Sequence, residues 1–121
     1  MTSQTPHDLG YASTTDLAEH WKIDRRTVPS VLKKFEISRS NLHNSPRYKW
    51  SDILLKVDRL PAESLRDAPE KILQPLLTTF EVADILDVSV QTVRNYTAAG
   101  RLSTVVLLAR TPRFHPMHCG L

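Results

Sequence analysis

The sequence predicts a mainly α-helical chain with small β-hairpin wings, organised as two winged helix-turn-helix units in tandem. The length of 121 residues allows one ordinary domain or two very small ones. A shift of 65 residues brings segment 13–28 into register with segment 78–93, with identical or similar residues at matching positions. We therefore expect a first, diverged unit at residues 11–55, a helical connector broken by proline at 56–75, and a second unit at 76–121.

The second unit has the clearer local signals. Thr78 followed by Glu81 is a capping box, which begins a helix, and Ser89 is a good N-cap for the next helix. Gly100 suits the position just past the end of that second helix. Residues 104–115 contain an apolar β-branched run, a break and a second short strand, which predict a hairpin with basic residues at its tip. The first helix is expected to bury Val82, Ile85 and Leu86.

The first unit repeats these signals with one departure. Ser13 and Asp16 are expected to cap its first helix, and Asp24 its second. Pro29 follows about five positions into the second helix, where it removes a hydrogen bond and should kink or delay the helix. The expected inward side chains are Leu17, Trp21, Val28, Val31 and Leu32.

The connector begins after a polar stretch at 38–44 and the segment 46–50, which takes the place of the first wing. Ser51 is expected to cap an amphipathic helix that stops at Pro61. Residues 61–75 contain apolar side chains between prolines, which favours a packed connector over a flexible linker.

Charge is distributed in blocks. Residues 1–21 have a net charge of −3, residues 22–49 of +6, residues 50–87 of −4 and residues 88–121 of +4, for a total of +3. Two basic blocks separated by acidic ones are typical of a protein whose selected surfaces face a polyanion.

The run from Leu77 to Tyr96, followed by Gly100, Arg101 and Leu102, resembles the winged-helix DNA-binding domains of the excisionase family. These domains are similar to the DNA-binding module of the mercury-resistance-regulator (MerR) superfamily. The resemblance covers residues 76–117, and the first unit resembles a diverged copy over residues 11–55. It implies that the second helix of each unit enters the major groove and that the wing contacts phosphates or the minor groove.

The resemblance assigns DNA contacts to outward side chains of each second helix and to the wings. Asn and Gln can pair with adenine, and Arg with guanine. The expected DNA-binding residues are Arg25, Arg26, Ser30 and Lys33 in the first unit, Arg47 and Lys49 at its wing, Ser89, Val90, Gln91, Arg94 and Asn95 in the second unit, and Arg110 and Arg113 at its wing.

Other chemistry is not favoured. His115, His118 and Cys119 could ligate a metal, but no fourth ligand lies at a regular spacing, so we expect a polar tail there. No catalytic constellation or Gly-rich phosphate loop is present, and we expect neither an enzyme nor a bound cofactor. Trp21 is expected in the core, while Trp50 either closes the first wing onto its helices or contacts a partner.

The expected function is sequence-specific binding to double-stranded DNA. The chain could act in excision of a mobile element beside an integrase (a recombinase), or as a small transcriptional regulator, with possible self-association on DNA. Because Pro29 weakens the first unit, an alternative is a protein-interaction module that binds a recombinase or RNA polymerase. The N-terminus lacks a signal peptide and no apolar run could span a membrane, so we expect a cytoplasmic, nucleoid-associated protein.

Overall fold

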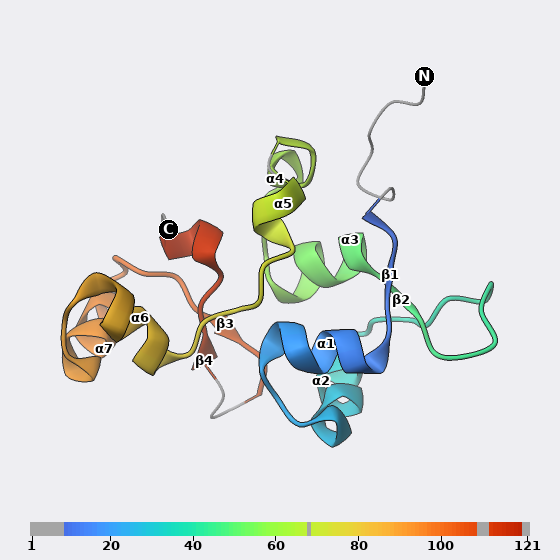
Figure 1. Cartoon of the computed structure of the whole chain (residues 1–121), viewed down its shortest axis with the longest axis horizontal. Helices are drawn as coiled ribbons and strands as arrows, with labels where there is room; N and C mark the ends of the chain where they lie inside the picture. Colours follow the sequence, from blue (N-terminus) through green and yellow to red (C-terminus); the bar gives the residue numbers. More distant parts are fainter. Residues whose placement is uncertain (1–8, 68, 109–111, 120–121) are drawn as a thin grey trace.

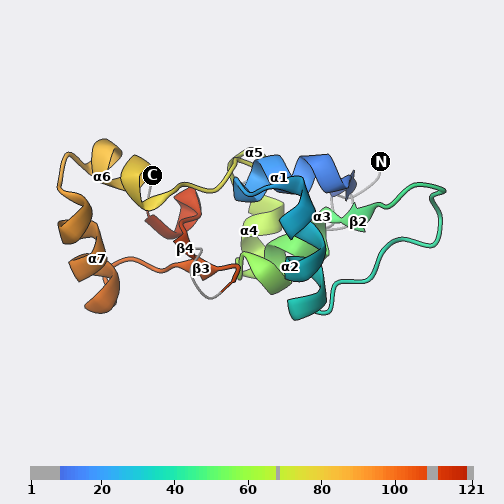
Figure 2. The ribbon, with the colours of Figure 1, turned by 90° about the horizontal axis from the view of Figure 1, so that it is seen from below.

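The computed structural model describes residues 9–67, 69–108 and 112–119. The described part is mainly α-helical, with two small antiparallel strand pairs. The predicted fold class is therefore confirmed. Strands β3 and β4 lie between the helix pair α1–α2 and the helix pair α6–α7, as both views in Figures 1 and 2 show.

The first helix pair follows the short strand β1, Tyr11–Ala12. Its elements are α1 (Thr14–Trp21), the 3₁₀ turn η2 (Arg25–Thr27) and α2 (Val28–Lys34). Ser13 and Asp16 form the capping box that the sequence predicts, and Asp24 accepts a hydrogen bond from the backbone N–H of Arg26 to begin η2. Pro29 lies in the first turn of α2, so it delays the helix instead of kinking it.

The first wing differs from the expected hairpin. Strand β2 (Tyr48–Lys49) pairs with β1, with Tyr11 opposite Lys49 and Ala12 opposite Tyr48. The preceding loop is closed by a backbone hydrogen bond of 2.7 Å from Ser40 N–H to the carbonyl of Arg47. Its polar sequence provides no apolar alternation to form a strand of its own.

The connector is a packed helical segment. Helix α3 (Trp50–Asp52) continues into the π-helical turn η3 (Ile53–Val57), and α4 (Ala62–Asp67) and α5 (Pro69–Ile72) follow. The expected N-cap role of Ser51 is wrong. The helix starts one residue earlier because Trp50 N–H is held by the carbonyl of Gly10 at 3.0 Å, and Ser51 is buried.

The second helix pair consists of α6 (Thr79–Leu86) and α7 (Val90–Ala98). Strand β3 (Val105–Val106) pairs with β4 (Pro112–Arg113), and the 3₁₀ turn η4 (Pro116–Cys119) follows. The Thr78–Glu81 capping box and the Ser89 N-cap are both present. Gly100 has φ +78°, which a residue with a Cβ adopts only at a cost.

Apolar side chains form one core for each helix pair and a third under the connector. The first core contains the predicted inward residues of α1 and α2, and also Leu76, Val105 and Leu107 from the second unit. The connector core consists of Leu54, Leu60, Leu65 and Ile72. The second helix pair is centred on Val82, Ala83, Val93 and Phe114. Ile85, predicted to face inward, is 52% exposed, because Ala83 occupies the inner face in its place.

A buried polar cluster joins the first helix pair to the connector. Asp58 is fully buried, and its carboxylate accepts from His20 Nε2 at 2.7 Å and from Trp21 Nε1 at 3.1 Å. His118 Nε2 donates to the Asp58 carbonyl at 3.0 Å. Trp50 packs edge-on against His20, with ring centroids 5.1 Å apart, and so closes the first wing onto its helices.

The expected polar tail at His115 is wrong. His115 is fully buried, with Nε2 2.9 Å from the carbonyl of Ile72 and Nδ1 accepting from Met117 N–H at 3.0 Å. Burial lowers the pKa of His115. The segment after β4 therefore packs onto the connector.

Among the helices of the described ranges, none is long and apolar enough to cross a membrane.

Candidate nucleic-acid interface

Helix α7 is held in a fixed rotation by its cap and its buried side. Ser89 Oγ accepts from Thr92 N–H at 3.0 Å, and Val93 is fully buried under the helix. With Val93 inward, Gln91, Arg94 and Asn95 face solvent and all three are exposed. The second helix of this unit thus presents two amides and a guanidinium on one face.

The amides of Gln91 and Asn95 are ordered by one another. Gln91 Nε2 donates to Asn95 Oδ1 at 3.0 Å, a pairing that positions i and i+4 allow on a helix. The remaining amide donors and acceptors point to solvent, which suits contact with base edges.

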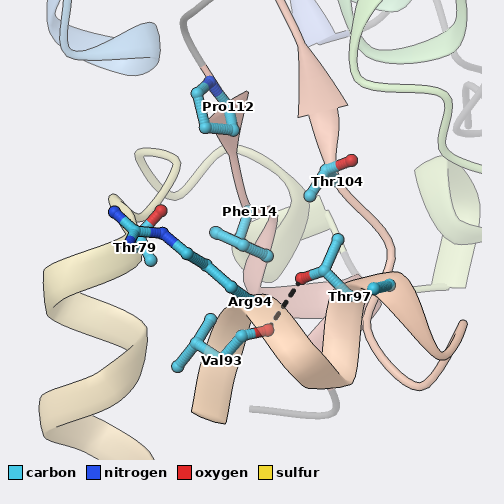
Figure 3. A pocket seen from close by; sticks show the side chains of 8 residues that line it. Thr79, Val93, Arg94, Thr97, Thr104, Pro112 and Phe114 are labelled. Carbon is cyan, nitrogen blue, oxygen red and sulfur yellow. Dashed lines mark hydrogen bonds between the residues drawn. The ribbon is translucent and has the colours of Figure 1, made fainter. Parts of the chain in front are cut away.

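Arg94 lies at a cleft of about 310 Å³ between α7, the start of α6 and the wing. Figure 3 shows its side chain extending from α7 toward Thr79, with Phe114 and Pro112 on the far side. The walls are mostly apolar, and Thr97 Oγ1, which also lines the cleft, donates to the Val93 carbonyl at 3.0 Å. A guanidinium at such an open cleft can turn outward toward a ligand without losing an internal ion pair.

Val90 departs from its expected role. It is partly buried and packs against the second helix-pair core, so its side chain supports the helix start and does not face outward. Ser89, by contrast, is exposed at the first turn, but its hydroxyl is engaged in capping.

The first unit presents its basic residues on η2 and α2. Arg25 and Arg26 lie on η2, where both are exposed, and Ser30 and Lys33 are exposed on α2. Arg26 is also paired within the chain, because its Nε lies 3.2 Å from Asp24 Oδ1. This pair lowers the pKa of Asp24.

The first wing places Arg47 and Lys49 differently. Lys49 is exposed on β2, whereas Arg47 is half-buried and donates from Nη1 to the carbonyl of Pro46 at 2.9 Å. The loop also holds Arg39, an exposed base that the sequence interpretation did not select, bonded from Nη2 to the carbonyl of Asn44 at 3.1 Å. The basic block around it was the available signal.

The expected wing contact of Arg113 is wrong. Its guanidinium turns toward α1, where Nε donates to the carbonyl of Trp21 at 2.9 Å and Nη2 to that of Lys22 at 2.8 Å. These carbonyls are the ones left without partners at a helix end, and a cation is favourable there. Burial lowers the pKa of Arg113. Arg110, the other expected wing residue, lies outside the described residues.

Figures 1 and 2 show α2 and α7 on the same side of the molecule, each behind the first helix of its pair in the view of Figure 1. The outward side chains of both units can thus contribute to one extended basic surface. Across the described ranges, no group of three or more His, Cys, Asp or Glu side chains is arranged to hold a metal ion.

Comparison with known families matches residues 76–114 to a family described as a helix-turn-helix domain. The match spans α6, α7 and the wing strands, which are the elements that form the candidate interface. No curated protein and no solved structure matches the chain. Residues 76–114 are therefore a helix-turn-helix domain, and the match supports DNA binding by this helix pair.

Proposed function

We propose that the chain is a sequence-specific duplex-DNA-binding protein of excisionase-like type, containing two helix-turn-helix units and acting without catalysis. Its output is architectural, as a recombination directionality factor, or regulatory, as a small transcriptional regulator. The observation that carries the proposal is the face of Gln91, Arg94 and Asn95 on α7, exposed within the domain that matches the helix-turn-helix family.

The similar geometry of the two helix pairs supports a second reader. Both first helices begin with a capping box, at Ser13 and at Thr78, which are 65 residues apart. Both end with a left-handed residue, Lys22 at φ 56° and Asp87 at φ 57°. Left-handed conformations are uncommon for such residues, so their recurrence at the same offset favours a common unit.

The turns and strands agree at the same offset. Ile23 N–H donates to the carbonyl of Ala18 at 3.0 Å, and Val88 N–H to that of Ala83 at 2.9 Å. In the same way, Ala12 pairs with Tyr48 in the first unit and Leu77 with Phe114 in the second.

The test is selection of bound duplexes from a random DNA library, followed by a salt titration of the winning sequence. Two readers that neutralise four to six phosphates predict a bipartite motif and a log–log salt slope of about −4 to −6. A motif beside an integrase attachment site would favour the recombination role, and one over a promoter the regulatory role. No enrichment at all would refute the proposal.

A second candidate is a first unit that binds a recombinase or RNA polymerase instead of DNA. It is favoured by the Asp24–Arg26 pair and by the Pro29 delay, which leaves Arg25 and Arg26 on a 3₁₀ turn. The double substitution Arg25→Ala and Arg26→Ala separates the two functions. Loss of DNA affinity supports a reader, whereas unchanged DNA affinity with weaker partner binding supports the alternative. A matched control removes Lys56 and Arg66, two exposed bases of the connector.

A further inference from the structure

The end of α1 is completed by the second unit. Three carbonyls of its last turn and cap accept hydrogen bonds from outside the first unit: His20 from Leu76 N–H at 2.8 Å, and Trp21 and Lys22 from the Arg113 guanidinium. A helix must find partners for these carbonyls in solvent, in a cap or in a neighbouring element. Here the second unit provides them.

Apolar contacts hold the same junction. Leu76, Val105 and Leu107 belong to the second unit in sequence, yet all three are fully buried in the core of the first helix pair. Separation of the units would expose these side chains together with the core that they cover. Interfaces that resemble a domain core do not open as readily as the polar contacts between mobile domains.

Two lysines brace the junction at separate points. Lys22 Nζ lies 2.6 and 2.7 Å from the two carboxylate oxygens of Glu81, and this hydrogen bond is the main cause of the lowered pKa of Glu81. Lys34, at the end of α2, donates to the carbonyls of Val106 and Leu107 at 3.3 and 3.1 Å. The second helix of the first unit is thereby tied directly to the wing strand β3.

The connector adds a further restraint. Its helices pack on one another through the connector core, and the segment after β4 returns to it through the bonds of His115 and His118. The two helix pairs are thus joined through packed contacts and not only through a tether.

We infer that the two units bind DNA as one rigid body and that the target is a bipartite duplex with a single permitted spacing between its half-sites. This inference rests on the proposed function. In B-DNA each added base pair moves the second half-site along and around the helix, with a full turn of about 34 Å in ~10.5 bp. A rigid reader cannot follow this displacement, whereas units on a flexible tether can.

The first test measures affinity for the selected duplex with spacers shortened by 2 bp or lengthened by 2, 5 and 10 bp. The rigid-body inference expects one optimum, a loss of about tenfold or more at ±2 bp, and no recovery at +10 bp, where affinity falls to that of one half-site. Affinity that is nearly constant across the series, on a confirmed bipartite motif, would overturn the inference and leave the proposed function standing.

Variants of the junction sharpen this test. Arg113→Gln with Glu81→Gln should flatten the spacing dependence while affinity for each isolated half-site is retained. The matched control is Arg66→Gln with Glu63→Gln, which makes the same two charge changes at exposed sites on α4. If the junction variant does not fold, Glu81→Gln alone, at the half-exposed Lys22 pair, is used for the same comparison.

A second measurement needs no DNA. Spin labels at Glu19→Cys on α1 and Asp84→Cys on α6, in a Cys119→Ser background, report the distance between the two helix pairs. Both labelled positions are exposed. One narrow distance distribution, unchanged by addition of the selected duplex, supports the rigid body. A broad or double distribution would overturn the inference, whatever the DNA selection finds.

Discussion

Asp58 is the residue whose loss should destabilise the fold most clearly. Its carboxylate is fully buried and satisfies two donors, His20 Nε2 at 2.7 Å and Trp21 Nε1 at 3.1 Å. In Asp58→Ala both donors stay buried without an acceptor, at about 1–3 kcal/mol each. Removal of one side of a buried polar pair is expected to cost about 3–5 kcal/mol in total.

A loss of this size is a large part of the whole stability, because a domain is typically stable by only about 5–15 kcal/mol. Asp58→Asn should cost less, about 2 kcal/mol, since one amide oxygen can still accept from one of the two donors. The expected order of the free energies of unfolding is therefore wild type, Asp58→Asn, Asp58→Ala.

Urea denaturation followed by circular dichroism and tryptophan fluorescence measures these free energies. Asp84→Ala removes an exposed carboxylate of α6 and serves as the control, with an expected change within about 0.5 kcal/mol. If Asp58→Ala lowers the free energy of unfolding by less than about 1 kcal/mol, the buried acceptor does not hold the cluster together and the reasoning fails.

Three further outcomes are expected. Because burial holds the pKa of His115 below its ordinary value of 6.5, the unfolded chain binds more protons just below that pH, and stability should fall as the pH drops through 6.5; the fall should be smaller in His115→Gln. Arg94→Ala should weaken binding to the selected duplex by about 1–3 kcal/mol and relax its sequence preference, whereas Arg110→Ala should weaken all sequences alike. Gly100→Ala should cost about 1–2 kcal/mol of stability through its positive φ alone, because a Cβ added there meets no atom within 4 Å.

Each of these outcomes has a distinct contradiction. Parallel stability–pH curves for wild type and His115→Gln would remove His115 as the cause. An equal loss on specific and random DNA would remove Arg94 as a base reader. An unchanged melting temperature in Gly100→Ala would mean that the turn relaxes without strain.

Local features of the fold could be predicted from the sequence. The Ser13 and Thr78 capping boxes, the Ser89 cap and the Gly100 position each depend on residues within a few positions of one another, and all occur in the structure. Helix ends are determined by such short-range hydrogen bonds, which a pattern can indicate.

Contacts across long sequence separations could not be predicted. Arg113 looks like an ordinary wing base, and its partners at the end of α1 are 91 and 92 residues away. Asp58 lies 38 residues from His20, with no motif that connects them. The exposed face of α7 was predicted because Val93 fixes its rotation locally; the buried role of Arg113 depends on how the two units pack.

The junction between the units also limits how many can be joined in this way. At the offset of 65 residues, Asp87 stands where Lys22 stands in the first unit, and Asp16 where Glu81 stands in the second. If a second chain stacked its first unit onto the second unit of this one, the attractive lysine–glutamate pair would become two facing carboxylates, which repel. The contact is therefore asymmetric and stops after one use. Growth into a row of stacked molecules is disfavoured, and neighbouring chains on a long duplex would be aligned by the DNA itself.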